Sequence, residues 1–300
     1  MFKKMSPHTV AVFQALFVTF LWSTSWVLIK TGLQDIPALT FAGLRYAIAF
    51  LCLLPFGLRH AHRAEFSRLS RRQWAQLALL GLLFIAVTQG AQFLGLTYLP
   101  AITVSLLLSF SPAMVALLGI SMLAERPTLV QWGGIVLYLV GTLVYFYPAA
   151  FPEREIAGLL IVGVGVLANA LSSILGRGIN RGGQIYPLTV TIVSMGVGSA
   201  VLLVAGVVAQ GLPSLSLENW LVVVWLAVVN TAFAFPIWNR TMRTLSAMES
   251  SIINNTMLVQ IALLAWIFLG EALGWQDIAG LALAGLGALI VQLRLRRTAT

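Results

Sequence analysis

Charge is scarce in this sequence of 300 residues: only 9% of them are Asp, Glu, Lys or Arg, whereas 59% are hydrophobic. An ordinary soluble domain carries roughly 25% charged residues, so this composition excludes a soluble globular protein. Cysteine is nearly absent as well. The single Cys52 lies in an apolar run, where it can form no intramolecular disulfide. The composition therefore predicts an integral membrane protein with little chain outside the bilayer.

Motifs for catalysis and for ATP-driven work are also missing. The chain has no Gly-Lys-Ser/Thr phosphate-binding loop, which excludes an ATP-driven motor. Its histidines, His8, His60 and His62, are all predicted to lie near one membrane surface, and one cysteine cannot complete a structural zinc site. No group of residues has the pattern of a catalytic site. We therefore expect no enzyme activity, no metal and no cofactor.

Long apolar runs are what the chain does have. A helix needs ~20 apolar residues to cross ~30 Å of hydrocarbon. Ten runs meet this length, at residues 9–30, 37–58, 73–96, 99–123, 128–147, 156–177, 186–210, 219–241, 245–269 and 275–293. The first run is too long for a signal peptide, so we interpret it as a retained helix. The predicted fold is an all-α integral membrane protein with ten transmembrane helices.

The positive charges predict the orientation of these spans, because Lys and Arg collect in cytoplasmic loops. With the N-terminus in the cytoplasm, all of the 18 Lys and Arg residues except Lys30, Arg45 and Arg154 lie on the inner side. Both termini of this multi-pass protein are then cytoplasmic. The topology accounts for the net charge of +9, so we expect no nucleic-acid partner.

The stretch from Leu99 to Leu143 occurs twice, 146 positions apart. The matched pairs least expected of apolar sequence are Glu125 with Glu271, Gly134 with Gly280, and Gly141 with Gly287. One ungapped register holds all of them, which indicates a duplication. We predict two five-helix repeats, at residues 1–150 and 151–300.

Because five is an odd number, the second repeat must enter the membrane upside down. The loop charges agree with this inversion. The connection between the second and third spans carries five arginines, whereas its counterpart between the seventh and eighth spans has Glu218 and no Lys or Arg. Inverted repeats characterise secondary transporters, whose substrate site lies near the membrane midplane where the repeats meet.

Several short segments, in order along the chain, resemble a known family. They are Leu21-Trp22-Ser23, Ile29-Lys30-Thr31-Gly32-Leu33, Ile36-Pro37, Gly43-Leu44-Arg45-Tyr46, Ser111-Pro112, Ala124-Glu125-Arg126-Pro127-Thr128, Trp238-Asn239-Arg240, Leu245-Ser246-Ala247 and Phe268-Leu269-Gly270-Glu271. Together they are similar to the drug/metabolite transporter (DMT) superfamily in its EamA-type branch, and within it to the YddG-type exporters of aromatic and other neutral amino acids. The resemblance implies a bacterial inner-membrane exporter of small metabolites.

Arg45 is the exceptional charge within the predicted spans. It lies about eight residues beyond Pro37, or ~12 Å into the second span at 1.5 Å per residue. An arginine at this depth faces the protein interior or reaches back to the interface. Two interpretations stay open: Arg45 extends outward near Asp35, or it holds the carboxylate of a substrate.

Uncharged polar and aromatic side chains inside the spans are the other candidates for substrate binding. Asn and Gln are costly to desolvate without partners, and a polar cavity also needs aromatic walls. Ser and Thr at such positions more often join helices to one another. The complete set of candidate substrate-binding residues is Trp22, Ser23, Arg45, Tyr46, Gln89, Gln92, Phe93, Ser109, Phe110, Asn169, Ser173, Asn230, Phe233, Asn254 and Asn255.

Two prolines and two carboxylates complete the predicted set. Pro112 and Pro236 lie inside spans, where proline removes helix hydrogen bonds, and we hypothesise that they are hinges. Glu125 and Glu271 end spans, where a carboxylate satisfies backbone donors at the start of the next helix, so we predict a structural role. The Gly-rich fifth and tenth spans are predicted to make scaffold or dimer contacts, in a monomer or a homodimer.

These observations predict a secondary transporter that moves a small-molecule substrate by alternating access at a midplane cavity between the repeats, surrounded by membrane lipid. No carboxylate lies at mid-bilayer, which favours facilitated diffusion over proton coupling. The expected substrates are aromatic and other neutral amino acids. The alternative is an exporter of drugs or of other metabolites such as purines or organic cations, with or without proton coupling. A membrane receptor is disfavoured because no loop is long enough to form an interaction domain.

Overall fold

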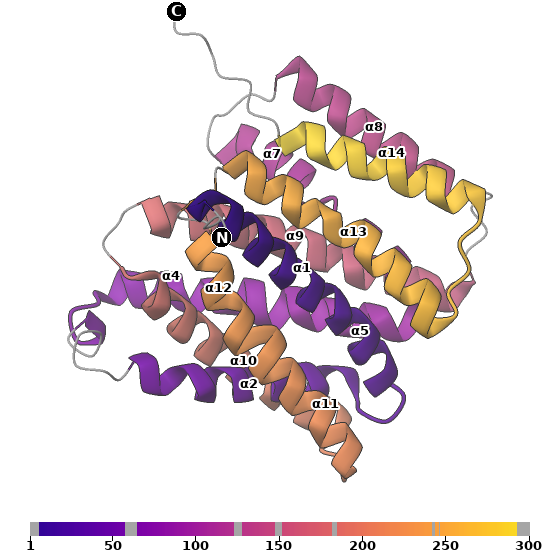
Figure 1. Ribbon diagram of the computed structural model, residues 1–300. Helices are drawn as coiled ribbons and strands as arrows, with labels where there is room; N and C mark the ends of the chain where they lie inside the picture. The colour runs from indigo at the N-terminus through magenta and orange to yellow at the C-terminus, as the bar shows by residue number, and fades with distance from the viewer. Residues whose placement is uncertain are drawn as a thin grey trace, which may run out of the picture. The chain divides into compact units, whose positions relative to one another are not determined.

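The computed structural model describes residues 6–57, 65–122, 128–147, 152–181, 185–241, 244–245 and 247–292. Within these ranges the chain forms helices and no strands (Figure 1). In order, they are α1 (Pro7–Gly32), α2 (Ala38–Gly57), α4 (Arg71–Gly81), the π-helix η1 (Leu82–Gln89), α5 (Gly90–Tyr98), α6 (Ala101–Leu108), α7 (Ser111–Met122), α8 (Leu129–Tyr145), α9 (Glu153–Arg181), α10 (Pro187–Gln210), α11 (Leu217–Ala227), the π-helix η2 (Val228–Phe233), α12 (Ala234–Thr241), α13 (Ala247–Leu269) and α14 (Trp275–Gln292).

Seven helical segments of the described chain are long and apolar enough to cross a membrane. They are Pro7–Gly32, Ala38–Gly57, Arg71–Tyr98, Ala101–Leu118, Glu153–Gly176, Pro187–Gln210 and Leu217–Trp238. Three shorter apolar helices, Leu129–Tyr145, Ile253–Leu269 and Trp275–Val291, fall on the remaining predicted runs. The all-helical membrane fold is therefore confirmed, and the number of ten spans stays a prediction.

The packing of the helices divides the chain into two units. Unit 1 consists of Met1–Val27, Ala101–Phe151 and Ala234–Thr300, and unit 2 consists of Leu28–Pro100 and Pro152–Phe233. Each unit thus combines helices from both halves of the sequence. The predicted repeat boundary at residue 150 describes similarity within the sequence, whereas the two units describe which helices pack together.

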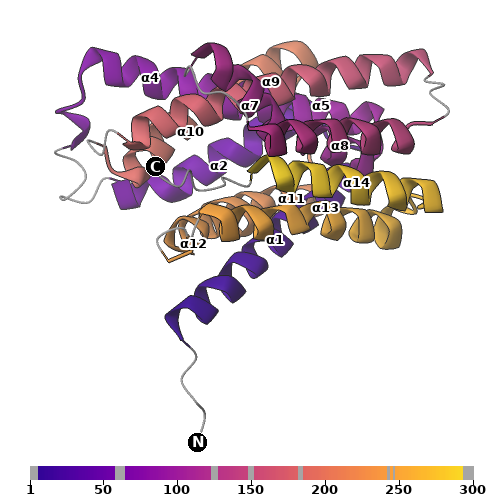
Figure 2. The same ribbon diagram turned by 90° about the horizontal axis from the view of Figure 1, so that it is seen from above.

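In unit 1, α8 and α14 lie side by side (Figure 1, Figure 2). A Cβ atom on Gly134 would lie 2.9 Å from the Gly287 carbonyl oxygen, and one on Gly141 would lie 2.7 Å from that of Gly280. Glycine permits this close approach of two backbones. Since the contacts run in opposite directions along the two helices, the repeat-equivalent glycines pack crosswise. The Gly-rich faces of these helices are thus used within the protein.

Unit 2 contains a similar pair, α2 and α10. A Cβ atom on Gly43 would lie 2.8 Å from the Leu203 nitrogen, and one on Gly206 would lie 2.6 Å from the Leu39 carbonyl carbon. These two helices are the second spans of the two predicted repeats, and they also run antiparallel. Each unit is therefore built around a helix and its repeat counterpart in opposite directions, as inverted insertion requires.

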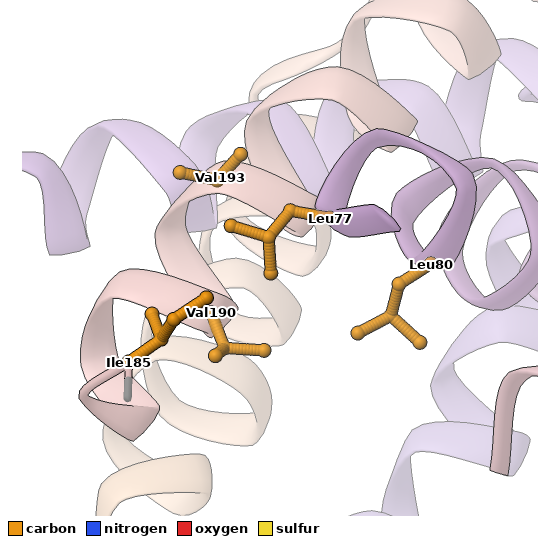
Figure 3. Close-up of a cluster of buried hydrophobic side chains, with 5 residues drawn as sticks. All are labelled: Leu77, Leu80, Ile185, Val190 and Val193. Carbon is orange, nitrogen blue, oxygen red and sulfur yellow. The ribbon is translucent and has the colours of Figure 1, made fainter. Parts of the chain in front are cut away.

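A cluster of buried aliphatic side chains holds α4 against the start of α10 in unit 2. Leu77 and Leu80 of α4 pack with Val190 and Val193 of α10 and with Ile185, which precedes α10 (Figure 3). Leu77 is fully buried. Burying a leucine side chain contributes roughly 1.5–3 kcal/mol when the alternative is water, so this cluster stabilises the helix ends that lie near the polar loops.

Side chains from distant parts of unit 2 satisfy the free backbone groups at helix ends. Lys30 Nζ donates to the carbonyl oxygens of Leu96 at 2.6 Å and Leu99 at 2.7 Å, at the end of α5. The Glu65 carboxylate accepts from the Tyr186 backbone N–H at 2.8 Å, at the start of α10. Helix ends leave such groups unpaired, and a cation at a C-terminus and an anion at an N-terminus also suit the helix dipole.

The crosswise glycine contact predicts that neighbouring positions in α8 respond differently to a methyl group. Gly134→Ala places a Cβ against the α14 backbone, and we expect it to lower the free energy of unfolding by about 1–3 kcal/mol. Gly133→Ala meets nothing within 4 Å, so it should be neutral or slightly stabilising. Thermal unfolding of the purified proteins in detergent measures both. Equal midpoints for the two variants would contradict the packing described here.

Candidate functional site

Arg45 is a buried cation in α2, with 5% of its surface exposed. Its Nε donates to Thr231 Oγ1 of η2 at 3.1 Å, and its guanidinium carbon lies 5.2 Å from the centroid of the Tyr46 ring. Asp35, toward which an outward-extended arginine would point, instead accepts from Asn219 Nδ2 at 3.2 Å. The guanidinium is therefore directed at a helix of the second repeat.

The partners of Arg45 do not neutralise its charge. Within the described residues, it contacts a hydroxyl and an aromatic ring, and it forms no ion pair with a carboxylate. A cation–π contact contributes about 0.5–2 kcal/mol. Removal of a charged group from water costs several kcal/mol even after the protein relaxes. A positive charge in a membrane-spanning helix is thus left with capacity for an anionic partner.

Thr231 lies in η2, where the backbone is wound more loosely than in an α-helix. Its hydroxyl donates to the carbonyl of Leu226, five residues earlier, at 2.8 Å. Pro236 follows η2, and because proline has no N–H and clashes with the carbonyl four residues before it, the regular α-pattern is interrupted here. The other π-helix, η1, begins at Leu82, which lies 146 residues before Val228, the start of η2. Such segments are rare and frequently mark functional sites.

An aromatic cluster lies in unit 1, where α1 meets α12. The Trp22 ring centroid is 5.4 Å from that of Phe235 and 5.2 Å from that of Trp238. Trp22 is a predicted site residue, whereas Trp238 is not, because a tryptophan near the end of a span usually lies at the headgroup level. Phe233, also predicted, belongs to unit 2 and is 51% exposed.

Ser23 takes part in a partly buried hydrogen-bond network between α1 and α13. Its hydroxyl lies 2.9 Å from Gln260 Oε1, and Gln260 Nε2 donates to Thr256 Oγ1 at 3.0 Å. Ser23 and Thr19, both fully buried, line the α1 side of this network. Hydrogen bonds of this kind join helices in membranes at about 0.6 kcal/mol each. In this conformation Ser23 therefore acts as a link between helices.

The two asparagines of α13 differ in their surroundings. Asn254 is exposed and Asn255 is partly buried. The Nδ2 atom of Asn255 is itself buried, yet it has no hydrogen-bond partner among the described residues. A buried donor without an acceptor costs about 1–3 kcal/mol. Asn255 thus offers a free amide donor in unit 1.

The other predicted residues of unit 2 have mixed environments. Phe93 is fully buried and packs edge-on against Phe41 with centroids 5.2 Å apart. Gln92 and Asn230 are buried. Gln89 and Asn169 are partly buried, and Ser173 is exposed, with its hydroxyl donating to the Asn169 carbonyl at 2.8 Å. Packing explains Phe93, so only the amides remain as candidates for ligand contact.

In unit 1, Ser109 and Phe110 form a break between α6 and α7. The Ser109 hydroxyl donates to the Leu106 carbonyl at 2.6 Å, and the Phe110 ring lies 4.8 Å from that of Tyr138. Pro112 is the second residue of α7. Each predicted hinge proline therefore lies directly beside an irregular segment of helix, and motion at either place stays a hypothesis.

Glu271 binds the start of α6. Its carboxylate accepts from the backbone N–H groups of Ala101 at 2.6 Å and Ile102 at 3.0 Å. The prediction placed such a cap on the next helix along the chain, whereas the structure places it on a helix of the other repeat. Glu125 lies outside the described residues.

Two ranges of the chain, residues 9–147 and 156–293, match the EamA-like transporter family. The chain belongs to this family. The match covers nearly all of the sequence and falls on its two halves separately. EamA-like proteins are transporters, which points to transport and not to catalysis.

Several relatives of this EamA-like chain are known. The "Uncharacterized transporter YvbV" of Bacillus subtilis is 25% identical over 68% of this chain and 65% of its own length, so the chain spans slightly less than two thirds of that relative. The "Probable amino-acid metabolite efflux pump" of Salmonella typhimurium is 28% identical over 96% of this chain and 97% of that protein. The "S-adenosylmethionine/S-adenosylhomocysteine transporter" of Chlamydia trachomatis is 24% identical over 88% of this chain and 83% of that protein.

A solved crystal structure also resembles the EamA-like chain. It covers 94% of this chain and 97% of its own, with a TM-score of 0.67 and 19% sequence identity. At this identity, the likeness supports the fold alone. The family match shows an EamA-like transporter, and the solved structure supports its fold.

The cap on α6 predicts a specific loss of stability. Glu271→Ala removes two hydrogen bonds from a helix N-terminus, and we expect it to lower the free energy of unfolding by about 1–2 kcal/mol. Glu271→Gln keeps one acceptor and should lose less. Thermal unfolding in detergent measures both, with the exposed Glu153→Ala as the control. A Glu271→Ala midpoint equal to that of the control would rule out a stabilising cap.

Proposed function

We propose that this transporter exports neutral amino acids with aromatic and aliphatic side chains across the bacterial inner membrane. The observation that carries the proposal is the buried Arg45, which has no carboxylate partner in the described part of the chain. The carboxylate of an amino acid supplies the missing counter-charge. Arginine is well suited to this task because its planar guanidinium can bind a carboxylate through two parallel hydrogen bonds.

Unit 1, taken by itself, also carries groups that suit an amphiphilic substrate. The rings of Trp22, Phe235 and Trp238 provide an aromatic surface of the kind that accepts apolar and aromatic side chains. Nδ2 of Asn255, which has no partner within the described ranges, is a candidate hydrogen-bond donor in the same unit. Arg45 in unit 2 and Trp22 in unit 1 each contact a helix from the other half of the sequence, and carriers with inverted repeats hold their substrates between the repeats. This arrangement supports alternating access between the repeats.

The carboxylates support facilitated diffusion over proton coupling. Asp35, Glu65 and Glu271 all lie at helix ends and accept hydrogen bonds from protein donors there. Proton-coupled carriers usually hold an ionisable group within the membrane. In this proposal, the substrate gradient alone drives export.

The alternative substrate classes differ in whether they carry the carboxylate of an amino acid. A buried guanidinium repels organic cations that lack a carboxylate, and it offers no counter-charge to a neutral purine, so drug and purine export are less favoured. S-adenosylmethionine and S-adenosylhomocysteine, which the name of the Chlamydia trachomatis relative mentions, both carry an α-carboxylate. Transport of such larger amino-acid derivatives is the second candidate function, because Arg45 suits their carboxylate equally well.

Uptake into liposomes tests the substrate class. We expect the purified protein to take up labelled phenylalanine and leucine with saturation, and to do so without a pH gradient. Lysine should be taken up poorly because its side chain adds a cation. Uptake only in the presence of a gradient would contradict facilitated diffusion. Uptake of labelled S-adenosylmethionine with none of phenylalanine would replace the first candidate by the second.

Arg45 variants test the carboxylate anchor. Arg45→Gln should raise the KM for phenylalanine uptake about 10- to 100-fold, since hydrogen bonds to charged groups contribute roughly 1.5–3 kcal/mol. Arg45→Lys keeps the positive charge but lacks the two parallel donors of the guanidinium, so its KM should lie between those of the wild type and Arg45→Gln. The exposed Arg71→Gln on α4 serves as the control. Unchanged KM in Arg45→Gln would remove the basis of the proposal.

A further inference from the structure

We propose that Thr231 positions the Arg45 guanidinium and thereby makes the site selective for substrates with a free carboxylate. This inference rests on the proposed function, because it takes Arg45 as the carboxylate anchor. The two residues lie 186 positions apart in the sequence, and the hydrogen bond between them is fully buried. It joins α2 to the π-helix η2.

The hydroxyl of Thr231 has a fixed polarity. Its single hydrogen is donated to the Leu226 carbonyl at 2.8 Å, so the oxygen faces Arg45 as an acceptor. Nε of Arg45 donates to this oxygen at 3.1 Å. Thr231 is fully buried, and the branch at its Cβ restricts rotation of the side chain. The acceptor therefore holds Nε in one direction.

Fixing Nε decides how a carboxylate can bind. A guanidinium binds a carboxylate either side-on, through Nε and one Nη, or end-on, through both Nη groups. Thr231 occupies Nε, and the described residues give Arg45 no hydrogen bond through its Nη groups. The end-on edge is thus presented to the ligand. A planar pair of donors held in this way fits a carboxylate and fits a primary amide poorly, because an amide has one acceptor oxygen.

The π-helix determines where the hydroxyl points. In a regular helix, the Thr hydroxyl bonds to a carbonyl three or four residues earlier, as that of Thr142 does to Tyr138. Thr231 reaches five residues back because η2 is wound more loosely. Thr88 in η1 makes the same five-residue bond, to the Leu83 carbonyl at 2.8 Å. The two threonines differ because the Arg45 side chain donates its hydrogen bond to Thr231. Thr88 therefore provides a matched control for loss of the hydroxyl alone.

Binding of two related probes to the purified full-length protein tests the inference. Dissociation constants for L-phenylalanine and L-phenylalaninamide are measured by calorimetric titration in detergent, and their ratio reports the preference for a carboxylate. Thr231→Val removes the hydroxyl at nearly constant volume. We expect it to weaken phenylalanine binding about tenfold and to leave phenylalaninamide binding unchanged. Thr231→Ser should keep most of the wild-type ratio, and Thr231→Ala should repeat the loss if valine prevents folding.

The controls separate the possible failures. A wild-type ratio in Thr231→Val or Thr231→Ala, or an equal fall in Thr88→Val, would overturn the role of Thr231. If Arg45→Gln lowers the ratio while the Thr231 variants do not, the inference fails and the proposed function stands. If Arg45→Gln leaves the ratio unchanged, or if the wild-type protein does not bind phenylalanine, both fail.

Discussion

Hydrocarbon offers no hydrogen-bond partners, and this constraint shapes every part of the protein that crosses the membrane. Backbone groups inside helices are paired automatically, but those at helix ends and breaks are not. Here distant side chains satisfy them: Lys30 caps α5, Glu65 caps α10 and Glu271 caps α6. The caps also fix which helices are neighbours, so the polar requirements of the backbone help to determine the tertiary structure.

Arg45 departs from this pattern among the described residues. The charges at helix ends are paired with backbone groups, whereas Arg45 is buried among a hydroxyl and an aromatic ring. Under the proposed function Arg45 binds the carboxylate of the cargo, and a permanent carboxylate beside it would compete with that cargo. An incompletely satisfied cation avoids this competition, at the cost of some stability when the site is empty.

The positions of the helices follow directly from the sequence, because ~20 apolar residues in a row have few alternatives to a buried helix. The sequence also predicted the register of the repeat and its glycine pairs, and the crosswise contact of Gly134 with Gly287 agrees with that prediction. The π-helices could not be predicted from the sequence. Proline at position 236 predicts that the regular helix is interrupted, but it does not predict that the interruption is a π-helix. Hydrophobic pattern identifies the buried face of a helix but not the helix that will cover it. Glu271 was therefore predicted to cap the wrong helix.

Prediction of the candidate site was limited in the same way. An arginine deep in a span is conspicuous, but its partner Thr231 is far away in sequence and lies on a helix of the other repeat. Ser23 and Asn255 are both polar residues of predicted spans, yet Ser23 is engaged with Gln260, whereas the buried amide nitrogen of Asn255 has no partner among the described residues. Only tertiary pairing distinguishes a polar side chain that joins helices from one available to a ligand. Trp238 was not predicted as a site residue for the same reason, because its contact with Trp22 is a tertiary one.

The pairing of α8 with α14 also has a consequence for the predicted duplication. Gln131 of α8 donates to the Val291 carbonyl at 3.1 Å, and Gln276 of α14 donates to the Val144 carbonyl at 2.8 Å. The two bonds close opposite ends of the pair, but the glutamines are one position out of the 146-residue register, so they are not copies of one ancestral residue. In that prediction, a single half presents its glycine face to an upside-down copy of itself. Fusion would then hold the two halves together permanently, and each half could acquire its own hydrogen bond across the pair.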